Sequence, residues 1–267
     1  MRTSTAVALL ILVGALGVAH SQEPGPNLLV NAGFETLDAD GRPAGWAPVW
    51  ARDAGTATVT VETTGAPEGT RCVKVTHTGS QDWSFAFPDR FAVRPMDILR
   101  ISAWVRSQDL AGSAEIGVVV TDARGEALNW VYGARRVPRS AEWSRIGGRL
   151  VMPPGANHIQ FRLTGAGIGT VWIDDAELRR VGNVDDLRAQ WPAEDASVET
   201  ESVRVRLDAR TGVIAVTDHR TGIVWRQAAA GTSVVLREVR TVGNVLTIAM
   251  EDVANDLVIR ATIAAKP

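Results

Sequence analysis

The stretch Asn27-Leu-Leu-Val-Asn-Ala-Gly-Phe-Glu35 is the part of this 267-residue chain that decides its fold class. Far downstream the chain contains a second distinctive stretch, Gly169-Thr-Val-Trp-Ile-Asp-Asp-Ala-Glu-Leu178. We expect the two stretches to form the opening and closing strands of one β-domain. In that arrangement Glu35 ends the first strand, Asp174 lies in the last, and both carboxylates reach the same edge of the domain.

Strand-like alternation recurs between the two stretches, with Gly, Pro and Asp at its breaks, and helical periodicity is nearly absent. In residues 101–106, Ile101, Ala103 and Val105 share one face, while the polar or aromatic residues between them share the other. This pattern is typical of a sheet with one buried face and one wetter face. We therefore predict an all-β fold, a jelly-roll β-sandwich over residues 27–181. The expected strands are 56–62, 71–78, 83–87, 98–107, 114–122, 143–151, 158–164 and 170–179.

The composition changes after residue 181. Residues 182–200 are acidic and polar, and we predict a linker with one short helix near 184–190. Residues 201–267 return to strand patterns, which indicates an incomplete second antiparallel β-sandwich or meander. Within it Asp208-Ala-Arg-Thr-Gly212 is echoed by Asp218-His-Arg-Thr-Gly222, and both stretches are typical of hairpin turns with Gly at positive φ. Because the chain stops directly after a strand, we expect a fragment or a truncated reading frame.

The first 21 residues have the pattern of a secretory signal peptide. Arg2 supplies the positive start, residues 6–18 form an uncharged apolar run, and Ala19-His20-Ser21 places small residues at the cleavage site. The run is shorter than the roughly 20 residues of a membrane span. We expect a secreted, periplasmic or cell-surface protein without a stable span after cleavage; a retained anchor is the alternative.

Charge and cysteine content narrow the function classes. The net charge is −2 and the basic residues are scattered, which argues against nucleic acid or an anionic membrane as a partner. The single cysteine, Cys72, cannot form an internal disulfide and is expected to pack as a small apolar residue. An exported chain of this kind obtains its stability from its core or from a metal ion.

The opening stretch, Trp46 after it and the closing stretch together resemble the jelly-roll carbohydrate-binding modules of the cellulose- and xylan-binding group. The resemblance implies a structural Ca²⁺ held by Glu35 and Asp174, with Asp175 as the substitute if the register differs by one. Two carboxylates with backbone carbonyls also form the hard oxygen cage that suits Ca²⁺ rather than zinc. The alternative is that these acids merely end strands in solvent. The strands after residue 201 resemble the start of the β-supersandwich domain that precedes the catalytic barrel of some large glycoside hydrolases.

The chain is rich in tryptophan, with nine Trp and one Tyr. Sugar sites combine flat aromatic platforms with forked polar groups, because pyranose rings present apolar faces rimmed by hydroxyls. Trp46, Trp172 and Trp143 are expected to have structural roles. Core packing is the alternative for every aromatic residue. The candidate carbohydrate-binding residues are Trp83, Trp104, Arg106, Asn129, Trp130 and Tyr132.

No catalytic constellation is recognisable. Asp174 and Asp175 are adjacent in an expected strand and therefore point to opposite faces, which excludes them as a glycosidase pair. We predict an exported, non-catalytic protein that binds a polysaccharide or oligosaccharide and targets a glycoside hydrolase, whose catalytic domain lies in cis or on another polypeptide. The alternatives are a structural or adhesive surface protein and a glycoside hydrolase with an unrecognised active site.

Overall fold

The computed structural model describes residues 24–191, 193–228 and 233–265. The chain divides into a jelly-roll unit, Glu23–Val181, and a C-terminal unit that contains Gly182–Pro267. The expected signal peptide, residues 1–21, lies outside the described residues. Among the described helices, none is long and apolar enough to cross a membrane.

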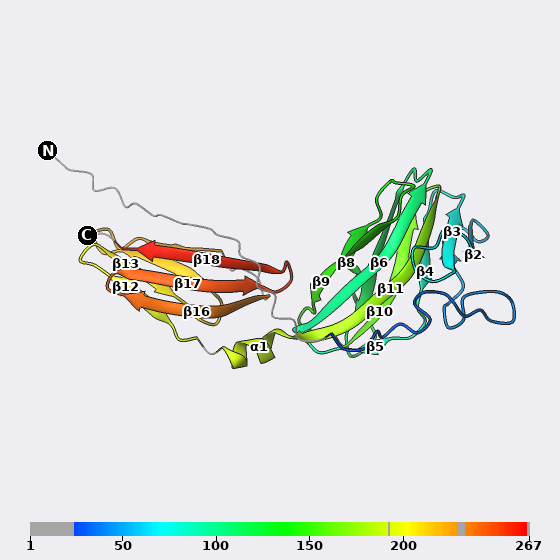
Figure 1. Ribbon diagram of the computed structural model, residues 1–267. Coiled ribbons are helices and arrows are strands. Elements are labelled where there is room, and N and C mark those ends of the chain that lie inside the picture. The colour runs from blue at the N-terminus through cyan, green and yellow to red at the C-terminus, as the bar shows by residue number, and fades with distance from the viewer. Residues whose placement is uncertain (1–23, 192, 229–232, 266–267) are drawn as a thin grey trace. The chain divides into compact units, whose positions relative to one another are not determined.

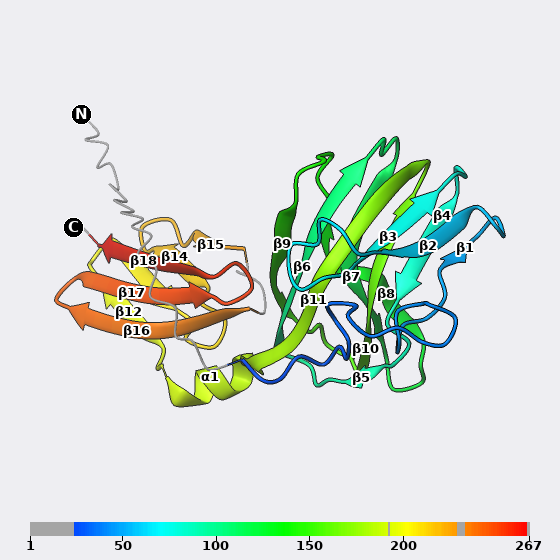
Figure 2. The ribbon, with the colours of Figure 1, turned by 45° about the vertical axis from the view of Figure 1, so that its right-hand side comes forward.

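The jelly-roll unit consists of two sheets whose strands pair in antiparallel fashion (Figures 1 and 2). The six-stranded sheet has the order β1-β4-β10-β7-β8, and β5 also pairs with β10. Its strands are β1 (Trp50–Ala51), β4 (Asp82–Ala86), β5 (Phe91–Ala92), β7 (Ser113–Thr121), β8 (Ala127–Arg136) and β10 (His158–Ala166). The five-stranded sheet has the order β2-β3-β11-β6-β9. Its strands are β2 (Ala57–Glu62), β3 (Cys72–His77), β6 (Asp97–Gln108), β9 (Ser144–Val151) and β11 (Gly169–Asn183).

Alternation along the strands builds the core between these sheets. Ile101, Ala103 and Val105 of β6 are fully buried, as their shared face predicts. Trp46 is also buried, and its ring stacks on Phe85 with the ring centres 5.1 Å apart. The expected all-β sandwich is therefore confirmed, and its interior is closed by aliphatic and aromatic side chains from both sheets.

The opening stretch is not the strand that the sequence predicts. Residues 27–35 form bends and turns, and Asn31 and Phe34 adopt positive φ. Asn27 nevertheless ties the stretch to β11, because its amide donates to the Ala176 carbonyl and accepts from the Leu178 amide. The two stretches do lie side by side, joined by the backbone bonds Leu28–Leu178 and Ala176–Ala32 as well as by the Asn27 side chain.

One long strand, β8, is absent from the predicted set. Its pairing with β7 has several register shifts, and Gly133 within it adopts a positive φ of 67°. These irregularities remove the alternation that identifies a strand in sequence. The short strands β1 and β5 were missed because two residues carry no periodicity.

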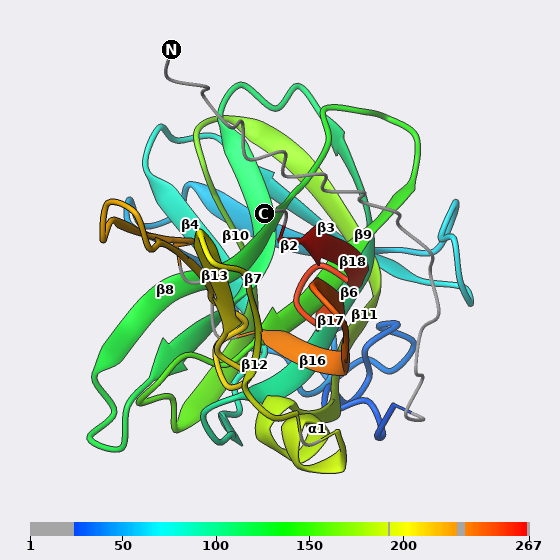
Figure 3. The ribbon, with the colours of Figure 1, turned by 90° about the vertical axis from the view of Figure 1, so that its left-hand side faces the viewer.

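The C-terminal unit has two sheets and a core of its own. One sheet contains β12 (Ala196–Glu199), β13 (Val203–Leu207), β14 (Ile214–Asp218) and β15 (Val224–Arg226). The other contains β16 (Val234–Val242), β17 (Val245–Asp252) and β18 (Leu257–Ala264). Helix α1 (Val184–Gln190) forms where a short helix is expected and lies beside β16 (Figure 3).

The expectation of a linker over 182–200 needs correction, because β12 pairs with β13 and buries Val198 in the core of the C-terminal unit. Only one apolar residue of this strand is buried, so the sequence pattern looks polar throughout.

The repeated turns have the predicted geometry. Gly212 and Gly222 adopt φ values of 69° and 70°, in the left-handed region that favours glycine. The carboxylates of Asp208 and Asp218 accept amide hydrogen bonds at the heads of the two turns. These turns join β13 to β14 and β14 to β15 as successive hairpins.

Candidate functional site

Each sheet of the jelly-roll unit has an outer face that points away from the core. We call the outer face of the five-stranded sheet the Arg106 face, formed by Glu62, Lys74, Ser102, Trp104, Arg106, Arg145, Trp172 and Glu177. We call the outer face of the six-stranded sheet the Arg162 face, formed by Trp50, Asp82, Ser84, Glu115, Trp130, Arg136, Arg162 and Thr164. The predicted binding residues are divided between the two faces and the core.

On the Arg106 face, arginine side chains of the protein itself lie against the aromatic rings. The Arg106 guanidinium lies 4.4 Å from the ring centre of Trp172 and 5.1 Å from that of Trp143. Its NH2 group also lies 3.7 Å from a Glu62 carboxylate oxygen, and the same oxygen accepts the Trp172 indole N–H. Trp172 is only 7 % exposed. Arg106 is therefore held between two rings and is not free to fork onto a ligand.

Trp104 lies on the same face under a second arginine. The Arg145 guanidinium is 5.9 Å from its ring centre and binds Asp175 at 2.6 Å and Glu177 at 3.2 Å. The Trp104 indole nitrogen is buried without a hydrogen-bond partner among the described residues. An ion-paired arginine also lies 5.8 Å from the ring centre of Trp50, so burial decides between the two rings: Trp104 is half-buried and is the poorer platform for a sugar, while Trp50 is 52 % exposed.

Trp83 is a core residue rather than a platform. Its side chain is 2 % exposed, and the side chains of Trp83 and Phe85 point between the sheets while Ser84 points outward. Gly165, its partner on β10, leaves room for the ring, because a Cβ there would lie 2.8 Å from it. A stacking platform must expose one ring face, so Trp83 is removed from the candidates.

The Arg162 face has the exposed rings that the other face lacks. Trp130 of β8 is 65 % exposed, and Trp50 of β1 is 52 % exposed. These strands form opposite edges of the sheet, separated by four strand spacings or roughly 19 Å.

Arg162 occupies the central strand between the two tryptophans. Its neighbours across the sheet are Ala86 of β4 and Gly117 of β7, and the Val131 side chain fills the space above Gly117. The guanidinium extends toward β8 and lies 6.0 Å from the ring centre of Trp130. Burial lowers the pKa of Arg162, and the charges of Asp82 and Glu115 act in the opposite direction.

Asn129 and Tyr132 lie near Trp130 on β8 but have structural contacts. The Asn129 side chain accepts the Val131 amide at 2.9 Å. The Tyr132 hydroxyl donates to the Val151 carbonyl at 2.7 Å, and its ring packs against the core. Burial raises the pKa of Tyr132. Of the six predicted residues, Trp130 alone presents an open aromatic surface.

Glu35 and Asp174 both contact the loop between β2 and β3. The Glu35 carboxylate accepts the Thr70 amide at 2.7 Å and the Arg71 amide at 2.9 Å. The Asp174 carboxylate accepts the Glu68 amide at 3.3 Å. The expectation that these acids reach one edge of the domain agrees with this geometry, although Glu35 arrives from a turn and not from a strand.

Asp174 is a fully buried carboxylate, with 0 % of its surface exposed. Burial raises its pKa to about 6, and the nearby charges of Asp175 and Glu35 add to that rise. Hydrogen bonds from Thr70 lower the pKa of Glu35. Among the described residues, no group of three or more His, Cys, Asp or Glu side chains is placed to hold a metal ion. Any cation here would need backbone carbonyls to complete its ligands.

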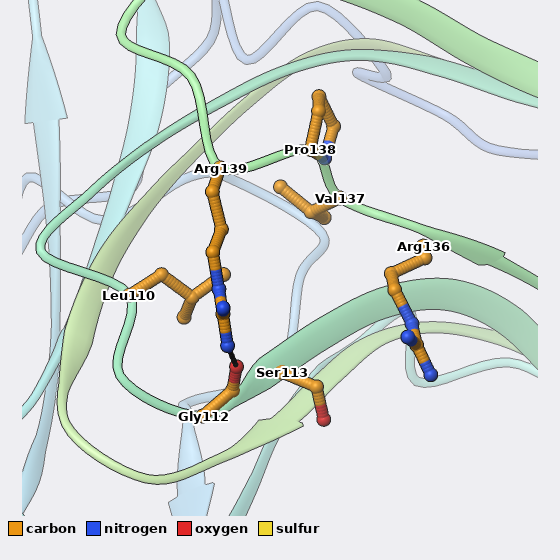
Figure 4. Close-up of a pocket in the computed structure, with 7 residues that line it drawn as sticks. All are labelled: Leu110, Gly112, Ser113, Arg136, Val137, Pro138 and Arg139. Carbon is orange, nitrogen blue, oxygen red and sulfur yellow. Dashed lines mark hydrogen bonds between the residues drawn. The ribbon is translucent and has the colours of Figure 1, made fainter.

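A pocket of about 510 Å³ adjoins the end of the Arg162 face (Figure 4). Its walls are mainly apolar, with Leu110, Val137 and Pro138 among them. The guanidinium of Arg139 is bound to the Gly112 carbonyl at 2.9 Å, and Arg136 lies apart from it in Figure 4. The pocket thus presents one arginine without an ion pair among the described residues, Arg136, beside an apolar wall.

Trp50 and Arg162 are the functional candidates that sequence reasoning missed. Arg162 takes a polar position in the alternation of residues 158–164, which indicates an outward side chain but not its neighbours. Trp50 lies in a strand of two residues, where no pattern gives its orientation. Both are recognisable only once β1, β10 and β8 are placed in one sheet.

The fold and this face define a β-sandwich module with an aromatic and polar sheet surface. The model of the family described as carbohydrate binding domain matches residues 26–168, and the chain belongs to that family. The curated proteins contain no match to the chain.

Similar solved structures include the enzymatically active domain of tailspike protein 4 of bacteriophage CBA120, with 13 % identity and a TM-score of 0.46 over 58 % of this chain. The match covers 21 % of that tailspike chain. The CBM22-1 xylan-binding domain of Paenibacillus barcinonensis Xyn10C has 18 % identity and a TM-score of 0.41, over 57 % of this chain and 92 % of its own. TmCBM61, solved with β-1,4-galactotriose, has 20 % identity and a TM-score of 0.40, over 58 % of this chain and 99 % of its own.

Proposed function

We propose that this chain is an exported, non-catalytic glycan-binding protein whose ligand lies across the Arg162 face. The exposed ring of Trp130 beside the central Arg162 carries this proposal. Trp130 and Trp50 supply stacking surfaces for pyranose rings, and Arg162, Thr164 and Ser84 supply polar groups between them. Such a surface binds weakly per contact and becomes effective when tethered to an enzyme that acts on the same polysaccharide.

Affinity electrophoresis of the full chain against a panel of polysaccharides tests the face. We expect Trp130→Ala and Trp50→Ala each to weaken the retardation roughly two- to tenfold, because each removes one aromatic contact. Trp104→Ala and Trp143→Ala are matched controls on the Arg106 face and should leave retardation unchanged. A loss confined to the two control variants would place the ligand on the opposite face, and no retardation by any glycan would reject binding.

The carboxylates of the Arg162 face support a non-catalytic role. Asp82 is ion-paired with Arg52, which lowers the pKa of this carboxyl and keeps it from acting as a general acid. Its strand is two strands away from that of Glu115. Glycoside hydrolysis requires an acid with a raised pKa opposite a second carboxylate. The hydrolase alternative would be established if the isolated chain hydrolysed a polysaccharide and Glu115→Gln abolished that activity.

We further propose that Ca²⁺ binds between the opening turn and β11. Asp174 fits this role, because it is a fully buried carboxylate close to a second carboxylate and both belong to the oxygen donors that Ca²⁺ prefers. When bound, the ion would supply positive charge that joins the opening turn to the last strand. Glu35 and Asp174 would be its side-chain ligands.

Thermal unfolding with added Ca²⁺ and with a chelator tests this site. A ligand at 100 times its Kd stabilises the folded state by about 2.7 kcal/mol, so the midpoint should fall by several degrees on chelation. Asp174→Asn should abolish the response, while Asp175→Asn should retain it. Equal midpoints in Ca²⁺ and in chelator for the wild-type chain would contradict a bound ion.

A further inference from the structure

Arg162 lies at the centre of a sheet face and forms no ion pair with any residue that the structure describes. Its Nε atom is buried and has no hydrogen-bond partner among the described residues. The adjacent positions across the sheet are held by Ala86 and Gly117, neither of which offers a polar side chain. Because Nε is covered, the terminal amino groups of the guanidinium, which are not among the buried unpartnered atoms, are the part that can reach a ligand at the sheet surface.

The acids near Arg162 do not neutralise it. Asp82 is bound by both Nε and NH2 of Arg52, and its ion pair uses both carboxylate oxygens. Glu115 forms no ion pair with any described residue, and Arg136 opposite it in the ladder is likewise without a bonded partner there. Arg52, Arg136 and Arg162 together exceed Asp82 and Glu115 by one positive charge. The face is thus locally cationic on a chain whose net charge is −2.

A carboxylate satisfies this site better than a neutral hydroxyl. The planar guanidinium can donate two parallel hydrogen bonds to one carboxylate. Such charge-assisted hydrogen bonds are roughly twice as strong as neutral ones. The Trp130 ring centre lies 6.0 Å from the guanidinium. A pyranose ring stacked on that tryptophan can therefore direct a carboxyl substituent, its own or that of the neighbouring sugar, toward Arg162.

We propose that the Arg162 face selects glycans that carry uronic acids, with Arg162 binding the carboxylate and Trp130 stacking on the sugar ring. This inference rests on the proposed glycan-binding function and adds the ligand's charge class. Arg136 is a second, peripheral cation that attracts the same polymer from the end of the face. Glu115 disfavours additional carboxylates near it, so the binding register places one acidic sugar at Arg162.

Isothermal titration of the full chain with paired polymers tests the proposal. The ligands are polygalacturonate and glucuronoxylan, each compared with the same polymer after chemical reduction of its carboxyl groups to alcohols. For the wild-type chain we expect at least one acidic polymer to bind on the order of tenfold more tightly than its reduced form, since an ionised hydrogen-bond pair is replaced by a neutral one. That difference should shrink as salt is raised from low to high concentration.

Substitutions then distinguish two-bond recognition of the carboxylate by Arg162 from non-specific attraction by positive charge. Arg162→Gln should bring the two forms of the polymer to the same affinity, and Arg162→Lys should restore only part of the difference, because it keeps the charge without the fork. Arg124→Gln removes an exposed cation elsewhere on the unit and should change nothing. Circular dichroism and melting of each variant verify that it is folded.

The outcomes distinguish this inference from the function beneath it. If the wild-type chain binds an acidic polymer and its reduced form equally, in a manner that Trp130→Ala weakens, then glycan binding stands and selection of uronic acids is overturned. If Arg124→Gln loses the preference as fully as Arg162→Gln does, the selectivity is general electrostatics and the assignment to Arg162 is overturned. If neither form of either polymer binds, while a neutral glycan binds on the same face, the uronic acid class is rejected. If no glycan binds at all, the proposed function itself fails.

Discussion

Two asparagine side chains fix the opening stretch, Asn27 by binding the closing strand and Asn31 by binding the residues that follow the stretch. Asn27 binds Ala176 and Leu178 on β11, and Asn31 donates to the carbonyls of Thr36 and Ala44 while it accepts the Thr36 amide. In a regular strand, backbone groups would form these bonds. Here asparagine amides, which have both a donor and an acceptor, supplement the backbone bonds Leu28–Leu178 and Ala176–Ala32.

We predict that Asn27→Ala destabilises the jelly-roll unit by about 1–3 kcal/mol, because it leaves the Ala176 carbonyl and the Leu178 amide without their partner. Denaturant unfolding followed by the fluorescence of the tryptophans measures the change. Asn129→Ala removes an exposed amide with one local contact and should shift the free energy of unfolding far less. Equal shifts for the two variants would show that Asn27 does not hold the stretch in place.

At the scale of elements, the sequence identifies regular strands and fails on irregular ones. The boundaries of α1 agree with the prediction, and most predicted strands differ by one or a few residues at their ends. The missing strand β8 contains register shifts, and β12 has only one fully buried side chain, Val198. Alternation is visible in sequence only where a strand is regular and one of its faces is buried.

The hairpin turn at Asp218 supplies a pH-dependent prediction. Hydrogen bonds from Arg220 lower the pKa of Asp218 to about 2, below its ordinary value of 3.8. A carboxyl with a depressed folded-state pKa adds stability that is fully present above about pH 4 and is lost as the pH falls toward 2. Asp218→Asn should therefore destabilise the C-terminal unit at pH 7, by an amount that diminishes between pH 4 and pH 2.

Denaturant midpoints of the full chain measured from pH 7 down to pH 2.5 follow this difference, with the transition of the C-terminal unit read by hydrogen exchange. Glu201→Gln changes the same charge at an exposed site and should show no such trend. A difference between wild type and Asp218→Asn that stays constant over this range would contradict the role of the ionised turn.

At the scale of the whole molecule, the chain has two separate cores. The core of the jelly-roll unit contains Ile101 and Phe161, while that of the C-terminal unit contains Leu207 and Ile248. Within the described part of the chain, the two clusters share no residue. Each unit therefore has the buried apolar surface from which a cooperative unfolding unit is built.

We predict that a cavity in one core destabilises its own unit and leaves the other unchanged. Ile101→Ala and Leu207→Ala each remove buried methyl groups and should cost about 2–5 kcal/mol in the unit concerned. Hydrogen exchange of the full-length chain, read by mass spectrometry, reports both units in one experiment. Faster exchange in both units after either substitution would show that they unfold together.

The candidate site shows where sequence reasoning stops. Trp83, Trp104, Trp130 and Tyr132 are all aromatic residues of the kind that can stack on a sugar. In the structure, however, Trp83 is buried, Trp104 lies under Arg145 and the Tyr132 hydroxyl is hydrogen-bonded to Val151. Trp130 keeps its ring exposed. Trp83, Trp104 and Tyr132 differ from Trp130 only in the residues that lie beside them. Those neighbours come from other strands of the chain.

The sequence by itself determined the all-β class and the repeated hairpin turns. These properties follow from alternation and turn chemistry, which act over a few residues. Only the tertiary structure decided which tryptophans are exposed and that Arg162 stands between Trp50 and Trp130 without an ion pair among the described residues. Exposure and charge pairing depend on the order of strands within a sheet, and that order brings together side chains that no local pattern connects.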